Sequence, residues 1–194
     1  MFPSLSMNDR LLPCARFCLG RRRKFLVSTL LAASTLMLGS TLSFAADDTA
    51  NEKTIDRATF TLKFPSNWSE ETKASDYKAD SNFTLNSGKN SYIQINITDK
   101  AEDPQKVLDN AVFNLDGLAI TTLSKTKIDE WGSHKGAGLH LKGKILGSDP
   151  GGIECFVFNS EHHNVLIIEF YYSSELKTAQ SEMDFIAKSF QMKE

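Results

Sequence analysis

The stretch that decides the fold reads AGLHLKGKILGSDPGGIECFVFNSEHHNVLIIEFYY and occupies residues 137–172. It holds three apolar runs of strand length, at 137–145, 153–158 and 165–172. In the first run Ala, Leu and Ile alternate with His and Lys, which is the period of a strand with one solvated face. Polar turns at 148–152 and 160–164 separate the runs and are short enough for hairpins. We therefore predict three consecutive antiparallel strands.

The segment before this meander predicts a strand and then a hairpin. The run FTLKFP at 60–65 alternates apolar and polar residues, and its proline ends the strand. Residues 83–85 and 92–98 flank a turn rich in Asn, Ser and Gly, which is typical of a hairpin. In the second arm the isoleucines occupy alternate positions and should share one face of the sheet.

Two amphipathic helices complete the pattern. The first begins at Asp103-Pro104, an N-cap followed by proline at the first helical position. Its apolar residues recur at three-and-four spacing as far as Leu118, so we expect it to end near residues 121–122. The second begins at residue 173 or 174, and its apolar face ends at Phe190.

Together these elements predict the fold class α+β, with helices packed on a mainly antiparallel central sheet. We expect one domain at 58–194. Residues 46–57 are polar and lack periodicity, and therefore predict a flexible leader.

The N-terminal segment, residues 1–45, predicts a cleaved export signal. A basic cluster at 21–24 precedes a charge-free apolar run, which is the order that the export machinery reads. Small residues at its exit place the cut between Ala45 and Ala46. A retained membrane anchor is the alternative, because the run approaches the length that spans a bilayer. Met7 is an alternative start.

Within the basic cluster, Arg22 and Arg23 are followed after one residue by Phe25 and Leu26. This order resembles the twin-arginine export signal. The alternative is an ordinary Sec signal that is rich in arginine. Either route predicts a periplasmic or secreted protein with no membrane span after cleavage.

Cleavage would change the charge and the cysteine content. The chain from Ala46 onward has 16 basic and 23 acidic residues, a net charge of −7. Such an acidic domain without clustered Lys or Arg is a poor match for nucleic acid or an anionic membrane. Only Cys155 remains, so an internal disulfide is excluded and the core must hold the domain together.

Three short motifs stand at matching places in a known family. They are Phe64-Pro65-Ser66-Asn67-Trp68 after the opening strand, Gly136-Ala137-Gly138 before the meander, and Ile186-Ala187-Lys188-Ser189-Phe190 at the end of the last helix. Over residues 58–191 the chain resembles the PsbP-like family, and its length and export signal resemble the secreted bacterial branch of the DcrB type. The resemblance implies an α/β/α sandwich with binding or assembly roles, and it supplies no catalytic residue and no cofactor.

The histidines and the cysteine are the candidates for chemistry. His162 and His163 stand beside Glu161 in a predicted turn, which favours an exposed hairpin tip over a metal site. His140 lies on the polar side of its strand. Cys155 lies in an apolar strand, which favours a buried structural thiol over a nucleophile. We therefore expect no catalytic, metal or cofactor residues.

Three aromatic residues, Trp68, Tyr92 and Trp131, are candidates for binding a partner. Packing in the core is the competing interpretation, because aromatic side chains supply much of the buried area of a small domain.

From these patterns we expect a non-catalytic extracytoplasmic domain that binds an envelope or extracellular protein or helps to assemble one. A carrier of a small apolar or lipid-like ligand is the alternative, and it requires an apolar cavity. An enzyme would require His134, His140 or His163 to meet an acid or Cys155 in a cleft. The sequence leaves the oligomeric state open.

The export route is testable by replacing Arg22 and Arg23 with lysine. Lysine keeps the charge but not the guanidinium groups, so we expect the double variant to accumulate uncleaved inside the cell if the twin-arginine route is used. Fractionation and the mass of the exported chain are the measurements. Unchanged export would assign the chain to the Sec route.

Overall fold

A computed structural model describes residues 52–99, 102–147 and 149–193. The predicted signal at 1–45, with Arg22, Arg23, Phe25 and Leu26 and the cleavage point at Ala45 and Ala46, lies outside the described residues. Neither of the two helices in the described part of the chain has the length and hydropathy of a membrane span.

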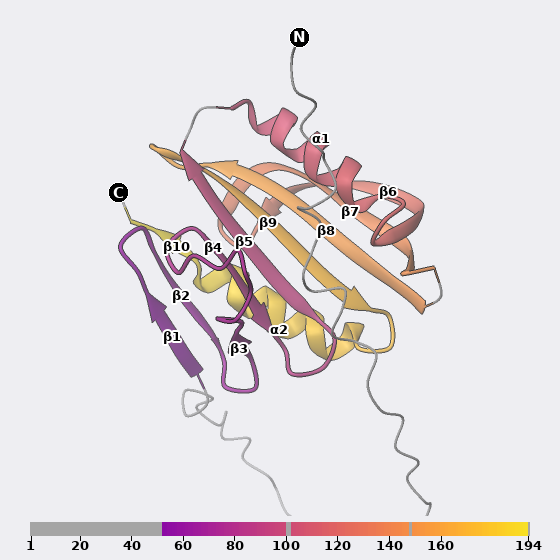
Figure 1. Ribbon diagram of the computed structural model, residues 1–194, viewed down its shortest axis with the longest axis horizontal. Helices are drawn as coiled ribbons and strands as arrows, with labels where there is room; N and C mark the ends of the chain where they lie inside the picture. Colours follow the sequence, from indigo (N-terminus) through magenta and orange to yellow (C-terminus); the bar gives the residue numbers. More distant parts are fainter. Residues whose placement is uncertain (1–51, 100–101, 148, 194) are drawn as a thin grey trace, which may run out of the picture. The chain divides into compact units, whose positions relative to one another are not determined.

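A seven-stranded antiparallel sheet forms the centre of the fold (Figure 1). Its strands, in spatial order, are β3 (Ser69–Glu70), β4 (Asn82–Asn86), β5 (Tyr92–Asp99), β9 (His163–Tyr172), β8 (Asp149–Asn159), β7 (His134–Ile145) and β6 (Ile120–Trp131). The predicted meander is confirmed as β7, β8 and β9, and the predicted hairpin as β4 and β5. The structure adds β6, a long edge strand that the sequence pattern did not predict.

A second, three-stranded sheet consists of β1 (Glu52–Asp56), β2 (Phe60–Pro65) and β10 (Gln191–Met192), in that order. The prediction of a flexible leader at 46–57 is corrected for residues 52–56, because β1 pairs with β2 over its whole length and Ile55 is buried. Residues 46–51 of the predicted leader lie outside the described residues. The polar composition of β1 concealed the strand, since backbone hydrogen bonds and one apolar side chain hold it in place.

Helix α1 (Pro104–Leu115) starts as predicted, with the Asp103 side chain accepting a hydrogen bond from the backbone N–H of Gln105 at 3.0 Å. It ends six residues before the expected point, which corrects the prediction. Asp116 caps it with extended backbone, and Gly117 follows in the left-handed region at φ 86°. The β-branched residues from Ile120 onward then pair with β7 instead of continuing the helix.

Helix α2 (Leu176–Ser189) confirms the predicted closing helix. Three polar residues at seven-residue spacing anchor it to different parts of the chain. The carboxylate of Glu175 accepts hydrogen bonds from Asn90 and Ser91 in the β4–β5 turn, and that of Glu182 accepts one from the Trp68 indole N–H at 2.8 Å. The Ser189 hydroxyl accepts a hydrogen bond from the backbone N–H of Lys63 and donates one to its carbonyl.

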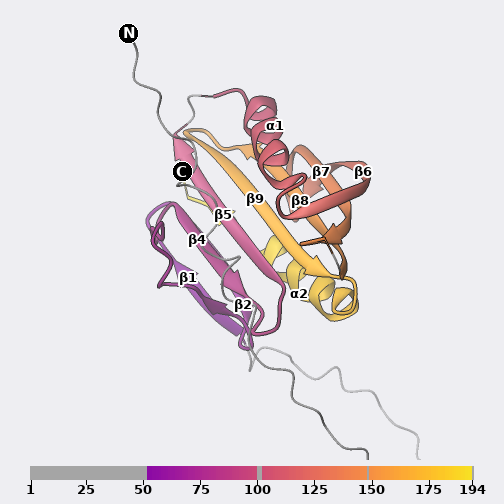
Figure 2. The ribbon, with the colours of Figure 1, turned by 45° about the vertical axis from the view of Figure 1, so that its right-hand side comes forward.

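The two helices pack on opposite faces of the large sheet (Figure 2). On one face, α2 and β2 bury a single apolar cluster with alternate residues of β5, β8 and β9. Phe60 of β2 lies at its centre, stacked on Phe83 at 5.0 Å and on Phe190 at 5.6 Å between ring centroids. On the other face, α1 packs against β7, β8 and β9. The observed architecture therefore agrees with the α+β class.

Phe60 and Phe113 provide a matched test of this packing. Phe60 is fully buried and Phe113 on α1 is 78% exposed. We expect Phe60→Ala to lower the free energy of unfolding by about 3–5 kcal/mol, because it removes apolar contacts and leaves a cavity. Phe113→Ala should change it by less than about 0.5 kcal/mol. Urea denaturation measures both, and equal losses would contradict this core.

Candidate functional site

The strongly exposed large apolar side chains come from α1 and from the segments around β6 and β7. Among the described residues these are Phe113, Leu118, Leu123 and Leu146, with exposed fractions of 53–78%. They belong to α1, the turn after it, β6 and the turn after β7. We call them the α1-end patch. Single exposed apolar residues are ordinary, but a group of them at one place marks an interaction surface.

The early end of α1 creates much of this patch. Once the chain leaves the helix, Leu118 no longer faces the sheet but stands in the turn before β6. The backbone N–H of Leu146 donates a hydrogen bond to the carbonyl of Ala119 at 3.0 Å, so the turn after β7 lies against the turn after α1. Leu118 and Leu146 are thereby brought close together.

A β-bulge exposes the third leucine. Thr122 pairs with Gly143 and Ser124 with Lys142, so Leu123 is an extra residue without a partner position on β7. Bulges commonly redirect a side chain at the edge of a sheet. A charged rim lies nearby, where Lys125 forms a 2.8 Å ion pair with Asp116. This hydrogen-bonded ammonium group lowers the pKa of the Asp116 carboxyl.

Leu146 is the least expected member of the patch. Its φ is 46°, which makes it the only non-glycine residue with positive φ in the described part of the chain. Left-handed backbone costs a side chain about 1–2 kcal/mol relative to glycine, and asparagine tolerates it better. Because the side chain of Leu146 is 53% exposed, its burial offsets little of this backbone cost. Neither the local conformation nor packing accounts for leucine here, so its apolar surface itself is the feature to explain.

A polar cluster lies on the opposite, α2 side of the sheet. Glu154 of β8 and Glu169 of β9 are directly opposite each other in the register, and His140 of β7 is opposite Glu154. The carboxyl group of Glu169 is buried, and one of its oxygens accepts a hydrogen bond from the Trp131 indole N–H at 2.6 Å. The Nε2 of His140 shares a 2.7 Å hydrogen bond with the Tyr171 hydroxyl. Its Nδ1 lies 3.6 Å from a Glu154 carboxylate oxygen.

Burial changes the acidity of this polar cluster. It raises the pKa of Glu169 to about 8, with a further contribution from the nearby Glu154 charge. Burial also raises the pKa of Glu154, which His140 partly opposes. The pKa of Tyr171 rises to about 12 for the same main reason. Burial therefore favours the protonated, neutral form of Glu169.

Cys155 does not belong to this cluster. It follows Glu154 in a strand, so its side chain points to the α1 face of the sheet, away from His140. Burial raises the pKa of its thiol to about 12, which keeps it protonated. The predicted buried structural thiol agrees with this geometry, and His140 has no nucleophilic thiol beside it.

The other histidines are separated. His134 stacks on Phe158 at 4.2 Å, and its Nε2 donates a hydrogen bond to the Phe190 carbonyl. His162 lies 3.9 Å from Glu161, whereas His163 lies 3.8 Å from a different acid, Asp99. The described residues contain no group of three or more His, Cys, Asp or Glu side chains placed to hold a metal ion.

The aromatic candidates occupy different places. Trp68 and Trp131 are both buried, so the interpretation of them as core residues holds and their indoles offer no surface to a partner. Tyr92 is partly exposed and stacks on Phe170 at 4.8 Å. Because Tyr92 and Ile93 are consecutive in β5 and Ile93 faces the α2 side, Tyr92 faces the α1 side, away from Trp131. Burial corrects the prediction that Trp68 and Trp131 are candidates for binding a partner, whereas Tyr92 stays a candidate.

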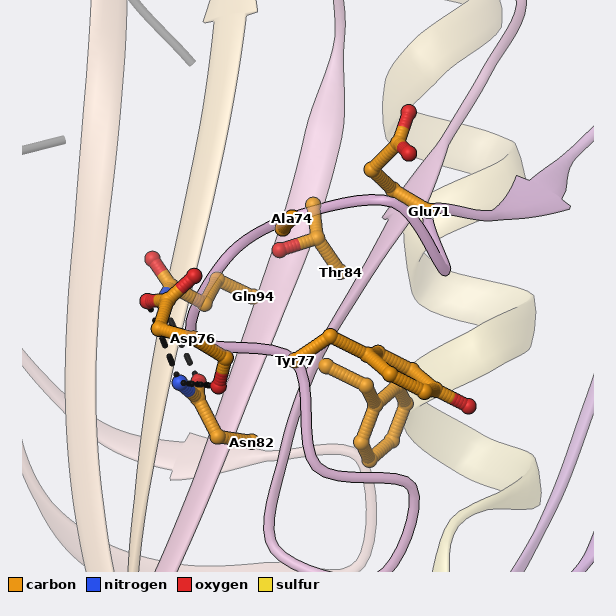
Figure 3. Close-up of a pocket in the computed structure, with 8 residues that line it drawn as sticks. Glu71, Ala74, Asp76, Tyr77, Asn82, Thr84 and Gln94 are labelled. Atoms are coloured by element: carbon orange, nitrogen blue, oxygen red, sulfur yellow. Dashed lines mark hydrogen bonds between the residues drawn. The ribbon is translucent and has the colours of Figure 1, made fainter. Parts of the chain in front are cut away.

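A pocket lies beside β4, lined by polar and apolar residues of the 71–77 loop, β4 and β5 (Figure 3). The side-chain amide of Asn82 donates two hydrogen bonds to Asp76, one to its backbone carbonyl and one to a carboxylate oxygen. Its volume of about 10 Å³ is near the minimum for one water molecule. The pocket is too small for an organic ligand.

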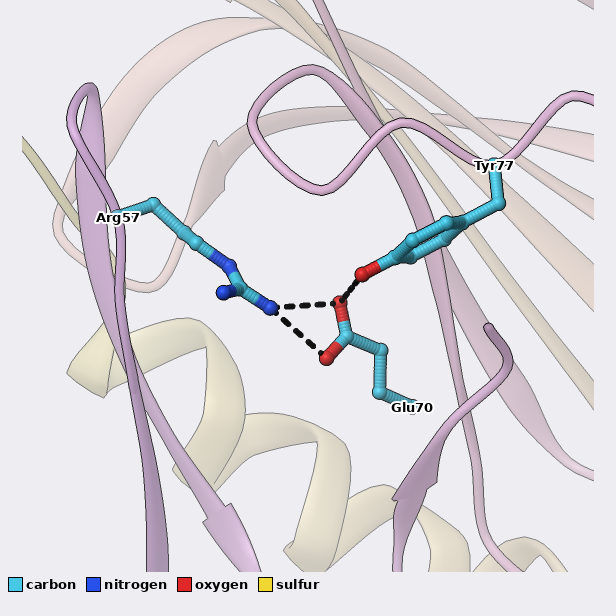
Figure 4. A network of polar contacts seen from close by, with 3 residues as sticks. All are labelled: Arg57, Glu70 and Tyr77. Carbon is cyan, nitrogen blue, oxygen red and sulfur yellow. Dashed lines mark hydrogen bonds and ion pairs between the residues drawn. The ribbon is translucent and has the colours of Figure 1, made fainter. Parts of the chain in front are cut away.

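A second polar network holds the same region together (Figure 4). Arg57, in the turn between β1 and β2, donates from Nη2 to both carboxylate oxygens of Glu70, at 3.1 and 3.2 Å. The Tyr77 hydroxyl donates to Glu70 at 3.0 Å. Burial and the Glu70 contact raise the pKa of Tyr77. These contacts tie the 71–81 loop to the small sheet and have a structural role.

No family model matches the chain, and no curated protein matches its sequence. Similar solved structures include a protein from Bacteroides thetaiotaomicron, with 10% identity over 74% of this chain and 48% of the other, at a TM-score of 0.48. They also include cyanobacterial PsbP (CyanoP) from Synechocystis, with 12% identity over 80% of this chain and 99% of the other, at a TM-score of 0.47. A third is LpqN from Mycobacterium tuberculosis, described as involved in cell envelope biogenesis, with 15% identity over 80% of this chain and 100% of the other, at a TM-score of 0.48.

Leu146→Asn tests whether this leucine serves the fold. Asparagine adopts positive φ more readily and is polar, so we expect the free energy of unfolding to rise by about 0.5–1 kcal/mol. Urea denaturation measures the change, and Lys144→Asn, at an exposed position in β7 two residues earlier, is the control for the added amide. A loss of more than about 1 kcal/mol would show that the leucine stabilises the fold.

Proposed function

We propose that this chain is a non-catalytic, extracytoplasmic protein-binding domain that docks its partner on the α1-end patch. The observation that carries the proposal is the concentration of exposed apolar side chains in this patch, including a leucine at positive φ. Protein interfaces are anchored by a few apolar or aromatic residues within a polar rim. Phe113 supplies the anchor and the Lys125–Asp116 pair supplies part of the rim.

The cellular location of the protein is part of the same proposal. The basic and apolar pattern of residues 21–42 supports export through an envelope membrane, and cleavage after Ala45 would leave the described domain as the working protein. The three short motifs of the sequence support membership of the secreted, DcrB-type branch of PsbP-like proteins. An α/β/α sandwich agrees with helices on both faces of the sheet.

A non-catalytic role is proposed because the side chains that do chemistry are not combined into a reactive set. His140 contacts Glu154 and Tyr171, but Cys155 is protonated and faces the other side of the sheet. The alternative proposal, a carrier of an apolar ligand, receives no support from the pocket beside β4, which has room for about one water molecule.

Quantitative capture from envelope extracts tests the docking surface. The exported protein is immobilised, and the bound proteins are compared with those retained by Phe113→Ser, Leu118→Ser and the double variant. We expect each single change to weaken binding of the main partner about tenfold, because truncating an interface anchor costs more than about 1 kcal/mol.

Lys73→Ser is the matched control, since Lys73 is exposed and lies in the loop between β3 and β4. It should retain the partner as the unmodified protein does. A partner bound equally by the unmodified protein and the double variant would exclude the α1-end patch as the docking surface.

A further inference from the structure

Two carboxyl groups oppose each other inside the sheet, on the face covered by α2. Glu154 and Glu169 are directly opposed on β8 and β9, and a directly opposed like-charged pair destabilises a sheet. Glu169 is only 8% exposed, so a charge there would also lose most of its hydration. The Trp131 indole N–H is its hydrogen-bond donor, and one such donor falls short of compensating a buried carboxylate.

The groups that face Glu169 come from every neighbouring element. On β8, Glu169 faces Glu154. On the next strand, β7, the His140 ring lies 3.6 Å from the Glu154 carboxylate. Its β5 neighbour in the register is the uncharged Ile93. Two residues along β9 lies Tyr171, and α2 contributes Asp184, whose negative charge acts on both carboxyl groups. His140 is the only basic side chain in this set, and it is nearer to Glu154.

The partner of Glu169 connects the sheet to the end of α2. Trp131 is the last residue of β6. Its ring packs edge-on against the ring of Phe190, the residue that directly follows α2, with 5.7 Å between the ring centroids. At the next residue, Gly132, an added Cβ would lie 2.1 Å from the Ala187 carbonyl oxygen, so the β6–β7 turn and the helix are in direct contact. Trp131 and the residue after it therefore connect Glu169 to the last turn of α2 by direct contacts.

We propose that Glu169 and Glu154 form a proton-dependent lock, in which the proton on Glu169 keeps Trp131 and the last turn of α2 packed on the sheet. Loss of that proton places two carboxylates in opposed positions beneath the helix and beside Asp184. The Trp131 N–H bonds more strongly to a carboxylate than to a neutral carboxyl, but one donor leaves most of the new charge without hydration. Water must then enter between the sheet and α2, and this water loosens the packing of Trp131 against the helix. The lock lies on the α2 side of the sheet and does not involve the α1-end patch.

The direction of the pH effect follows from the proton count. In the unfolded chain a glutamate has a pKa of about 4.5, and in the folded protein burial raises the pKa of Glu169 to about 8. Between these values the folded state holds one proton more than the unfolded state. The contribution of this group is therefore complete below about pH 4.5 and is lost as pH rises toward 8.

Glu169→Gln tests the lock in the exported protein obtained by expressing all 194 residues. The amide oxygen of Gln still accepts from Trp131 but cannot ionise. In the unmodified protein the unfolding equilibrium constant should rise by up to tenfold per pH unit, from this proton alone, between about pH 4.5 and 8. Glu169→Gln should remove that component. Glu161→Gln, an exposed acid with the same change, should retain it.

Two further measurements keep the lock testable if Glu169→Gln folds poorly. In the unmodified protein at pH 7, infrared spectroscopy should show the carbonyl band of a protonated carboxylic acid, which disappears above about pH 8. Above pH 8, amides of 128–134 and 183–190 should exchange hydrogen faster in the unmodified protein than in Glu154→Gln, where the opposed charge is absent. No protonated carboxyl band at pH 7, or the same pH dependence in Glu169→Gln and the unmodified protein, would overturn the proposal.

Discussion

The packing of α2 against β2 and the large sheet is the contact on which the rest of the structure depends. The small sheet and the large sheet have no strand in common, and the apolar cluster under α2 packs them together, with the Arg57–Glu70 ion pair as a further link. Phe60 and Phe190 form its centre, with one ring from β2 and one from the end of the helix. The polar residues Glu175, Glu182 and Ser189 fix the rotation of the helix, because each of them bonds to a different segment of the chain. Without α2 the two sheets would expose their apolar faces to water.

The two faces of the large sheet have different chemistry because of this arrangement. On the α2 side the apolar cluster surrounds acidic groups, and the same burial that stabilises the core holds Glu169 as a neutral acid. On the α1 side a short helix covers only part of the sheet, and apolar side chains near its end remain exposed. The proposed proton-dependent lock lies on the α2 side of the large sheet, and the proposed docking surface lies near the end of α1.

Local patterns predicted the elements well where one residue type repeats along a strand or helix. The alternation in β2 and β5 was sufficient to predict these strands, and the Asp103 cap was sufficient to predict the start of α1. Each pattern reflects a local preference of the backbone. The same reasoning failed at Leu118, whose helical spacing continued the apolar stripe although the chain had already left the helix. It also failed at β1 and β6, whose polar residues form strands because neighbouring strands satisfy their backbone hydrogen bonds.

The sequence by itself determined the α+β class, the meander, both helices, the buried state of Cys155 and the expectation of export. Each of these depends on residues that are close in the chain or on overall composition. Only the tertiary structure decided which side chains share a site. Glu154 meets Glu169 through strand register. The Trp131 indole reaches Glu169 through a side-chain hydrogen bond, and the turn that holds Leu118 lies against Leu146 through the backbone hydrogen bond between Ala119 and Leu146. These partners are 15 to 38 residues apart in the chain, and no local periodicity encodes contact between them.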